Sequence, residues 1–366
     1  LAVGAILSGP AGGVNGAAAY GQMVNANNIV AFDMGGTSTD ISLIEDDTPH
    51  LSSERFEAGW KIAVPMIDIH TMGAGGGSIA TVGPGGILQV GPESAGAYPG
   101  PACYAKGGNQ ATVTDANLAL GYLDPDNFLG GAASIDRNLS EKAIQDNVAG
   151  PLGLSIIDAA AGISQIVSTT IAEGIRLMSV QRGVDPRGFS MMAFGGAAGL
   201  HASSVARQLQ VSRVVLPSAA PVLSAQGMLS TDLKYDYSRS FTASLDGIDL
   251  GTVRTIVTQM EAEGRNKLES QGINVDQIEV TISSDMRYLD QIYEINVPLP
   301  ALNQSDESIL QEWAENFHQR YQDLYSYSQS TQEIRMVTLR VTVNGLLPRL
   351  DSKKKPSGGS IAAADK

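Results

Sequence analysis

The chain has 366 residues, of which 43% are hydrophobic and only 5% aromatic, and its formal net charge is -14 at pH 7. This acidic balance, with no basic cluster outside the C-terminal tail, excludes nucleic acid and anionic membranes as main partners. The single cysteine, Cys103, cannot form an internal disulfide, and we expect a buried structural thiol there. No apolar run reaches the roughly 20 residues of a membrane span. We therefore expect a cytoplasmic globular protein of two or three domains.

The first predicted elements are a helix at 14–24 and an apolar strand at 28–32 that runs into a glycine turn and returns as a strand at 41–44. Glycine backbone N–H groups and hydroxyls at such a hairpin tip can bind a phosphate oxygen. Asp33 and Asp40 flank the turn and suit a Mg²⁺ held partly through water. Ordinary hairpins show the same pattern, so a phosphate site is a hypothesis at this point. Its candidate binding residues are Gly35, Gly36, Thr37, Ser38 and Thr39.

Further along, short β-prone runs separated by glycine-rich turns indicate a loop-rich β insertion at about 59–108. A helix is predicted at 115–123, capped by Thr114 or Asp115, and a long amphipathic helix at 155–182. A strand at 189–194, a glycine turn at 195–199, a helix at 200–209 and a strand at 211–216 follow. This strand, turn and helix order suits adenosine or phosphate, with Gly195, Gly196 and Gly199 as candidate contacts. Close helix–strand packing would explain the same glycines.

From about residue 232 the pattern changes to strand, helix, strand, strand, helix, strand, which indicates a separate α+β unit. The helices are expected near 250–271 and 308–325, and three of the strands near 279–288, 291–297 and 333–343. We divide the chain into an α/β domain at 1–231, an α+β domain at 232–350 and a flexible tail at 351–366.

Asp68 and His70 are two residues apart on a β-prone run, so their side chains leave the same face. A carboxylate and an imidazole suit Zn²⁺, Mn²⁺ or Fe²⁺, and Asp115 is the candidate third ligand. The alternative is that Asp68 caps a turn, His70 forms a local hydrogen bond and Asp115 is a helix cap. His201, in the first turn of a helix, is a candidate catalytic residue with Asp33 and Asp40, or else a packed core histidine.

Five segments taken together resemble the hydantoinase A/5-oxoprolinase family. They are Ser8-Gly-Pro-Ala-Gly-Gly13, Asp33-Met-Gly-Gly-Thr-Ser-Thr-Asp40, 68–78, Val113-Thr-Asp115-Ala-Asn117 and Phe194-Gly-Gly-Ala-Ala-Gly-Leu-His201. The resemblance runs in order from residue 1 to about 350. Arg287, Tyr288 and Gln291 match a strand of the family's C-terminal region.

The resemblance implies a ribonuclease-H-like half of the actin/Hsp70/sugar-kinase (ASKHA) fold, with ATP and Mg²⁺ bound between two such halves. It also implies ATP-dependent hydrolysis of a small cyclic amide, of hydantoin or 5-oxoproline type, with a B-type partner subunit in a hetero-oligomer. Phosphorylation of the carbonyl oxygen would activate the amide, and the transition metal would orient the substrate.

Family members begin with a first ribonuclease-H-like half that has its own phosphate turn, and residues 33–40 match the second turn. We therefore expect a missing N-terminal half to complete the ATP site. Two alternatives stay open: an A-type subunit of an ATP-dependent ketone carboxylase of acetone or acetophenone type, and a non-catalytic nucleotide-binding or structural half-subunit.

Overall fold

The computed structural model describes residues 7–52, 55–57, 59–62, 66–229 and 231–347. The chain divides into two compact units, Leu1–Ser230 and Thr231–Lys366. The tail predicted at 351–366 lies outside the described residues. No single described helix is long and apolar enough to cross a membrane, although the bent pair Arg137–Leu152 and Ile156–Gln181 has a suitable combined length and composition.

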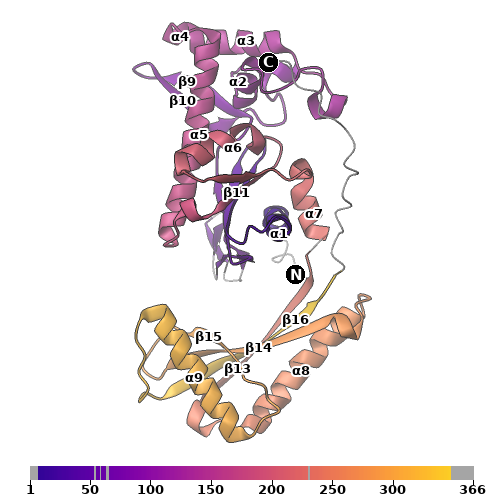
Figure 1. The fold of residues 1–366 in the computed structure, drawn as a ribbon, viewed down its shortest axis with the longest axis vertical. Coiled ribbons are helices and arrows are strands. Elements are labelled where there is room, and N and C mark those ends of the chain that lie inside the picture. Colours follow the sequence, from indigo (N-terminus) through magenta and orange to yellow (C-terminus); the bar gives the residue numbers. More distant parts are fainter. Residues whose placement is uncertain (1–6, 53–54, 58, 63–65, 230, 348–366) are drawn as a thin grey trace. The chain divides into compact units, whose positions relative to one another are not determined.

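The first unit is built on a mixed sheet with the strand order β12-β11-β1-β2-β3, in which β8 also pairs with β2 (Figure 1). Strands β1, β11 and β12 are parallel, and β2 runs antiparallel to β1. The strands are β1 (Ile29–Met34), β2 (Thr39–Glu45), β3 (Thr48–Pro49), β8 (His70–Met72), β11 (Ser190–Phe194) and β12 (Arg213–Val215).

Helices cover both faces of this sheet because alternate strand residues point to opposite sides. Ile29, Ala31 and Phe194 face α1 (Ser8–Met23) and α7 (Leu223–Leu229). Val30 and Phe32 face the opposite layer. That layer contains α2 (Val113–Ala119), α5 (Ile156–Gln181) and α6 (Ala198–Leu209).

Further short strands and helices lie between the hairpin and α5 in the sequence. They are β4 (Leu51–Ser52), β5 (Arg55–Glu57), β6 (Trp60–Ile62), β7 (Met66–Ile67), β9 (Ser78–Gly83), β10 (Ile87–Ser94), α3 (Arg137–Ile144) and α4 (Gly150–Leu152). Among them, β6, β7, β9 and β10 fall within the insertion predicted at about 59–108. The helix predicted at 115–123 begins earlier, because Thr112 is its N-cap and Asp115 completes a capping box from the third position.

The second unit is an antiparallel sheet of order β13-β16-β14-β15, with α8 and α9 on one face (Figure 1). Its elements are β13 (Leu233–Ser244), α8 (Leu250–Glu269), β14 (Ile278–Tyr288), β15 (Ile295–Pro298), α9 (Asp306–Tyr325) and β16 (Ile334–Gly345). Trp313 and Phe317 of α9 are fully buried against the sheet, and the Trp313 indole N–H donates to Ser284 Oγ at 3.1 Å. This is the element order that the sequence pattern predicts.

Helix α1 begins at Ser8, six residues before the predicted start. The glycines of its first turns, which suggest a loop in the sequence, instead allow α1 to pack closely against α7. A Cβ on Gly12 would lie 2.5 Å from the carbonyl oxygen of Ser224, and one on Gly16 would lie 2.9 Å from Leu223. A Cβ on Gly227 of α7 would overlap the carbonyl oxygen of Gly12. The two backbones therefore approach more closely than any larger residue allows.

We expect Gly227→Ala to destabilise the first unit by about 3 kcal/mol, since the added methyl group must push α7 away from α1. Gly9→Ala in α1 is the matched control, because nothing lies within 4 Å of its Cβ, and it should be neutral or stabilising by at most about 1 kcal/mol. Hydrogen exchange of the β1 amides measures both. Equal exchange in the two variants would contradict the close-packing account.

Candidate functional site

The tip of the β1–β2 hairpin has its carbonyl groups turned inward and three amide groups left free. Gly35 N–H donates to Ser38 O at 3.0 Å and closes the turn. The carbonyl oxygens of Gly35 and Gly36 accept from Gly76 and Gly77 N–H at 3.0 and 2.6 Å. Among the described residues, no acceptor faces the N–H groups of Gly36, Thr37 and Ser38, and the hydroxyls of Thr37 and Ser38 form no hydrogen bond. Such a set of amides is complementary to an anion.

The glycine loop at 73–77 supports this tip from behind. A Cβ on Gly75 would lie 2.7 Å from the backbone nitrogen of Thr37, so the loop can approach only as glycine. Thr114 of α2 donates to Gly76 O from its N–H at 2.7 Å and from its Oγ1 at 2.8 Å. The buried Thr39 hydroxyl donates to Ala74 O, so Thr39 is structural and its hydroxyl is not free for a ligand.

The second glycine turn meets the same edge of the sheet, because β11 lies directly beside β1. Gly195 has φ +83° and leaves no room for a side chain beside the Asp33 carboxylate. Ala197 N–H donates to Met34 O at 2.9 Å, and α6 begins at the next residue. Gly196 faces open space, whereas Gly199 lies inside α6 in ordinary contact with Leu216. The two turns and the N-terminus of α6 therefore converge at the carboxyl ends of β1 and β11.

Asp33 and Asp40 are directly paired across β1 and β2, so both carboxylates lie on one face of the sheet. Burial raises the pKa of Asp33, the charge of Asp40 raises it further, and a hydrogen bond from Ser224 Oγ at 3.3 Å opposes these effects. Asp40 accepts from Thr71 Oγ1 at 2.6 Å. No ion pair among the described residues involves either aspartate. Two carboxylates therefore lie side by side, and no lysine, arginine or histidine of the described residues forms an ion pair with them.

A cavity of about 620 Å³ lies beside α6. Leu200, Ser203, Ser204 and Arg207 of α6 form one wall, and Ser164 and Gln165 of α5 belong to the other side. Leu200 lies in the first turn of α6, the helix that follows the second glycine turn. The cavity therefore combines an apolar residue near the turn with several hydroxyl, amide and guanidinium groups.

The structure does not support the metal site predicted from Asp68, His70 and Asp115. Asp68 forms an ion pair with Arg182 at the end of α5, and His70 has an exposed side chain on β8. No group of three His, Cys, Asp or Glu side chains in the described part of the chain could hold a metal ion. Asp68 is paired with Arg182, and Asp115, the predicted third ligand, is bonded to other parts of the protein.

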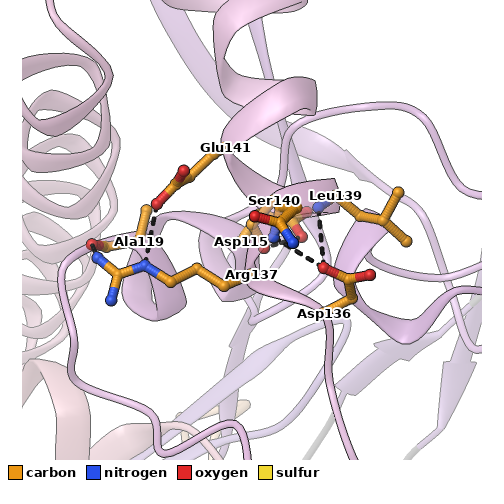
Figure 2. Close-up of polar contacts among 8 residues, drawn as sticks. Asp115, Ala119, Asp136, Arg137, Leu139, Ser140 and Glu141 are labelled. Carbon is orange, nitrogen blue, oxygen red and sulfur yellow. Dashed lines mark hydrogen bonds and ion pairs between the residues drawn. The ribbon is translucent and has the colours of Figure 1, made fainter.

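Asp115 is a fully buried structural carboxylate. Its oxygens accept from Cys103 N–H at 2.9 Å, Ala102 N–H at 3.2 Å, Thr112 N–H at 3.0 Å, Thr112 Oγ1 at 2.7 Å and Ser140 Oγ at 2.8 Å. Figure 2 shows Asp115 beside Ser140 of α3, with the α3 N-cap Asp136 nearby. The carboxylate joins the loop around Cys103 to α2 and α3, which explains why it is not available as a ligand.

His201 is also structural, because it has no exposed surface and both of its ring nitrogens are hydrogen-bonded. Ser168 Oγ donates to Ser164 O at 2.8 Å and is then the acceptor for His201 Nδ1–H at 3.2 Å. His201 Nε2 accepts from Asn117 Nδ2 at 3.1 Å. This network assigns a neutral imidazole, and burial lowers its pKa to about 4. The predicted catalytic role of His201 is therefore not supported.

Sequence reasoning gave no role to Ser224 or to the backbone of the glycine loop. Ser224 is distant in sequence from Asp33 and lies in α7, a helix that the sequence pattern did not indicate. The sequence predicts Thr114 as a helix cap, whereas the structure shows it bonded to the glycine loop. Thr114 is the second residue of α2, and a hydroxyl residue inside the helix was the only sequence feature that could have indicated this contact.

We expect Asp115→Asn to destabilise the first unit by about 3 kcal/mol, because the amide group cannot accept all five hydrogen bonds in a buried site. Asp136→Asn is the control, since asparagine caps a helix as well as aspartate and the change should stay within about 0.5 kcal/mol. Urea unfolding followed by circular dichroism measures both. An equal loss of stability in the two variants would show that the hydrogen bonds to the buried Asp115 carboxylate do not contribute specifically to stability.

His201 predicts a pH dependence of stability. Above pH 6.5 the imidazole is neutral in both states. As pH falls toward about 4, the unfolded chain binds a proton that the folded chain does not, so stability is lost. The wild type should lose about 3 kcal/mol more over this window than His201→Gln, as measured by urea unfolding at several pH values. Parallel pH profiles would contradict this.

Comparisons with known proteins match most of the chain. The family model described as hydantoinase/oxoprolinase matches residues 2–237, and the hydantoinase/oxoprolinase C-terminal domain matches residues 249–364. Caprolactamase subunit alpha of Pseudomonas jessenii is 41% identical over 351 residues, which are 95% of this chain and 50% of that protein.

Two solved structures are also similar. Nucleotide-free acetone carboxylase has a TM-score of 0.83 at 28% identity, and the ATP-dependent caprolactamase from Pseudomonas jessenii has a TM-score of 0.71 at 39% identity. Each match covers 93% of this chain and 50% of the other. The chain thus spans about half the length of these relatives. The resemblance seen in the sequence motifs is confirmed, and the chain belongs to the hydantoinase/oxoprolinase family.

Proposed function

We propose that this chain supplies one wall of the ATP site in an enzyme that hydrolyses a cyclic amide. The observation that carries the proposal is the hairpin tip, where three adjacent backbone N–H groups, at Gly36, Thr37 and Ser38, lack acceptors among the described residues. Backbone amides of this kind bind phosphate without lysines, which suits a chain of net charge -14.

The strand order supports a ribonuclease-H-like half of the ASKHA fold. Three strands form an antiparallel meander, β1-β2-β3, and two further parallel strands, β11 and β12, extend the sheet beside β1. Ligands of open α/β sheets bind at the carboxyl ends of the strands. That edge is where the two glycine turns converge.

Asp33 and Asp40 fit a magnesium ion. They are two opposed carboxylates on one face, burial and mutual repulsion oppose ionisation of Asp33, and neither has a described cationic partner. Mg²⁺ needs few protein carboxylates because it keeps several waters, so the absence of a third ligand among the described residues is compatible with it. When bound, the ion would neutralise phosphate charge.

The cavity beside α6 is the proposed place for the nucleoside. It follows the second glycine turn, and its size exceeds that of a purine base and ribose. Leu200 offers an apolar surface, whereas Ser203, Ser204 and Arg207 offer hydrogen-bond partners. The remaining half of the relatives' length is proposed to supply the other wall of the ATP site.

Unstrained amides resist hydrolysis, and phosphorylation converts the carbonyl oxygen into a leaving group. In this scheme the chain holds and orients the phosphates, and a B-type partner subunit completes ring opening. The 41% identity with caprolactamase subunit alpha favours a lactam or another cyclic amide. The higher TM-score of acetone carboxylase keeps ketone carboxylation as the second candidate.

The proposal is tested by co-expressing the chain with the remainder of its protein and its partner subunit, and by measuring ATP-dependent turnover of caprolactam, 5-oxoproline, hydantoin and, with bicarbonate, acetone. We expect turnover of a cyclic amide. Asp33→Asn and Asp40→Asn should each lower kcat by about 100-fold or more, since a neutral amide binds the proposed Mg²⁺ more weakly than a carboxylate does.

His70→Ala is the control variant, because its side chain is exposed and belongs to no described three-residue metal group, and we expect unchanged turnover. Turnover of acetone, and of none of the cyclic amides, would contradict the proposal and support an ATP-dependent ketone carboxylase. ATP binding without turnover of any of the four substrates would favour a non-catalytic nucleotide-binding half.

A further inference from the structure

Several exposed apolar side chains of the second unit lie where the turn between β14 and β15 meets the end of α9. Ile292 and Tyr293 are 87% and 82% exposed on the turn between β14 and β15. Leu324, Tyr325 and Tyr327, at the end of α9 and just after it, are each about half exposed. Large exposed apolar side chains that cluster in this way usually mark a binding surface. This surface is remote in sequence from both glycine turns.

A cavity of about 320 Å³ opens within this cluster. We call it the tyrosine pocket, and its walls are Asp290, Gln291, Ile292, Tyr293, Tyr321, Tyr325 and Tyr327. Four of these seven residues are tyrosines, in a protein whose aromatic content is only 5%. The pocket is therefore an unusual local concentration of ring surface.

Three of the four tyrosine rings contact one another. The Tyr321 ring lies 4.6 Å from Tyr325 and 5.5 Å from Tyr327, the second pair nearly perpendicular at 78°. Tyr321 OH contacts Tyr327 OH at 3.3 Å and also accepts from Gln291 Nε2. The rings of Tyr321 and Tyr327 therefore meet nearly at a right angle, and the hydroxyls of these two residues are already hydrogen-bonded.

The turn that carries Asp290 is also held in place. Arg287 Nη1 donates to the carbonyl oxygens of Leu289 and Gln291, at 2.7 Å for the first of these. These are the residues on either side of Asp290. The guanidinium group of Arg287 is thus engaged by the backbone. Arg287 and Gln291, which match the family's C-terminal strand, therefore hold the turn in place through hydrogen bonds.

The charges in the tyrosine pocket favour a cation. The Asp290 carboxylate is exposed and takes part in none of the ion pairs found among the described residues. The one cation–π contact in the described part of the chain joins Lys106 to Tyr104, so no lysine or arginine of those residues covers the pocket's rings. Tyrosine faces and a nearby carboxylate attract the same ligands, which are ammonium and guanidinium groups.

We propose that the tyrosine pocket is an aromatic cage that binds an organic cation. Tyr325 and Tyr327 supply exposed ring surface, Tyr321 forms the buried back wall and Asp290 supplies the opposite charge. The pocket is large enough to admit a quaternary ammonium or a guanidinium group. Such a group could belong to a small metabolite or to a side chain of another protein, and the chemistry of recognition is common to both. This inference is independent of the ATP site.

The test uses the full chain and ligand-observed NMR titration with choline and with 3,3-dimethylbutan-1-ol, the uncharged isostere of choline. We expect choline to bind about tenfold more tightly than the isostere. Asp290→Asn and Tyr325→Leu should each weaken choline binding by about threefold or more, since the first removes the charge and the second a π face.

Matched controls are Asp276→Asn, an exposed aspartate of the same unit, and Tyr98→Leu, which removes an 81% exposed tyrosine from the first unit. Both should bind choline as the wild type does. A competition arm with N-acetyl-argininamide distinguishes the sources: tighter binding than choline indicates a protein side chain, and weaker binding indicates a small ammonium compound. Equal binding of choline and its isostere, no saturable binding of any of the cations, or unaltered choline binding in both pocket variants would overturn the proposal.

Discussion

The hydrogen bonds from Gly76 and Gly77 to the carbonyl oxygens of Gly35 and Gly36 are the contact on which the rest of the candidate site depends. A peptide group that turns its carbonyl inward turns the following N–H outward. By binding the two carbonyls from behind, the glycine loop leaves the N–H groups of Gly36 and Thr37 facing away from it. Side chains on the loop would prevent this approach, because a Cβ on Gly75 would lie 2.7 Å from Thr37 N.

The surrounding structure keeps these two loops together. Thr114 attaches the glycine loop to α2, and the buried Asp115 attaches α2 to α3 and to the loop around Cys103. On the other face, glycine contacts between α1 and α7 bring Ser224 to Asp33. Residues that belong to separate sequence motifs therefore form one connected set of contacts that holds the same edge of the sheet. Most of them position backbone atoms and do not themselves meet a ligand.

The elements with strong periodicity could be predicted from sequence: the β1–β2 hairpin, α5, β11 and the alternating pattern of the second unit. The failures have a common cause. Spacing shows which face a side chain leaves but not what it meets, so Asp115 was assigned to a metal although backbone amides of Ala102 and Cys103 face it. His201 was likewise judged by its helix position, whereas Asn117 and Ser168 enclose it. The start of α1 was missed because glycines at a close helix contact have the composition of a loop.

The most direct test of the central claim is a crystal structure of the complete protein with magnesium and a non-hydrolysable ATP analogue. The account predicts a phosphate oxygen at about 3 Å from the backbone nitrogens of Gly36, Thr37 and Ser38, with the metal on the face that carries Asp33 and Asp40. It also predicts the nucleoside in the cavity beside α6. A nucleotide bound elsewhere, with the three amides facing only water, would contradict it.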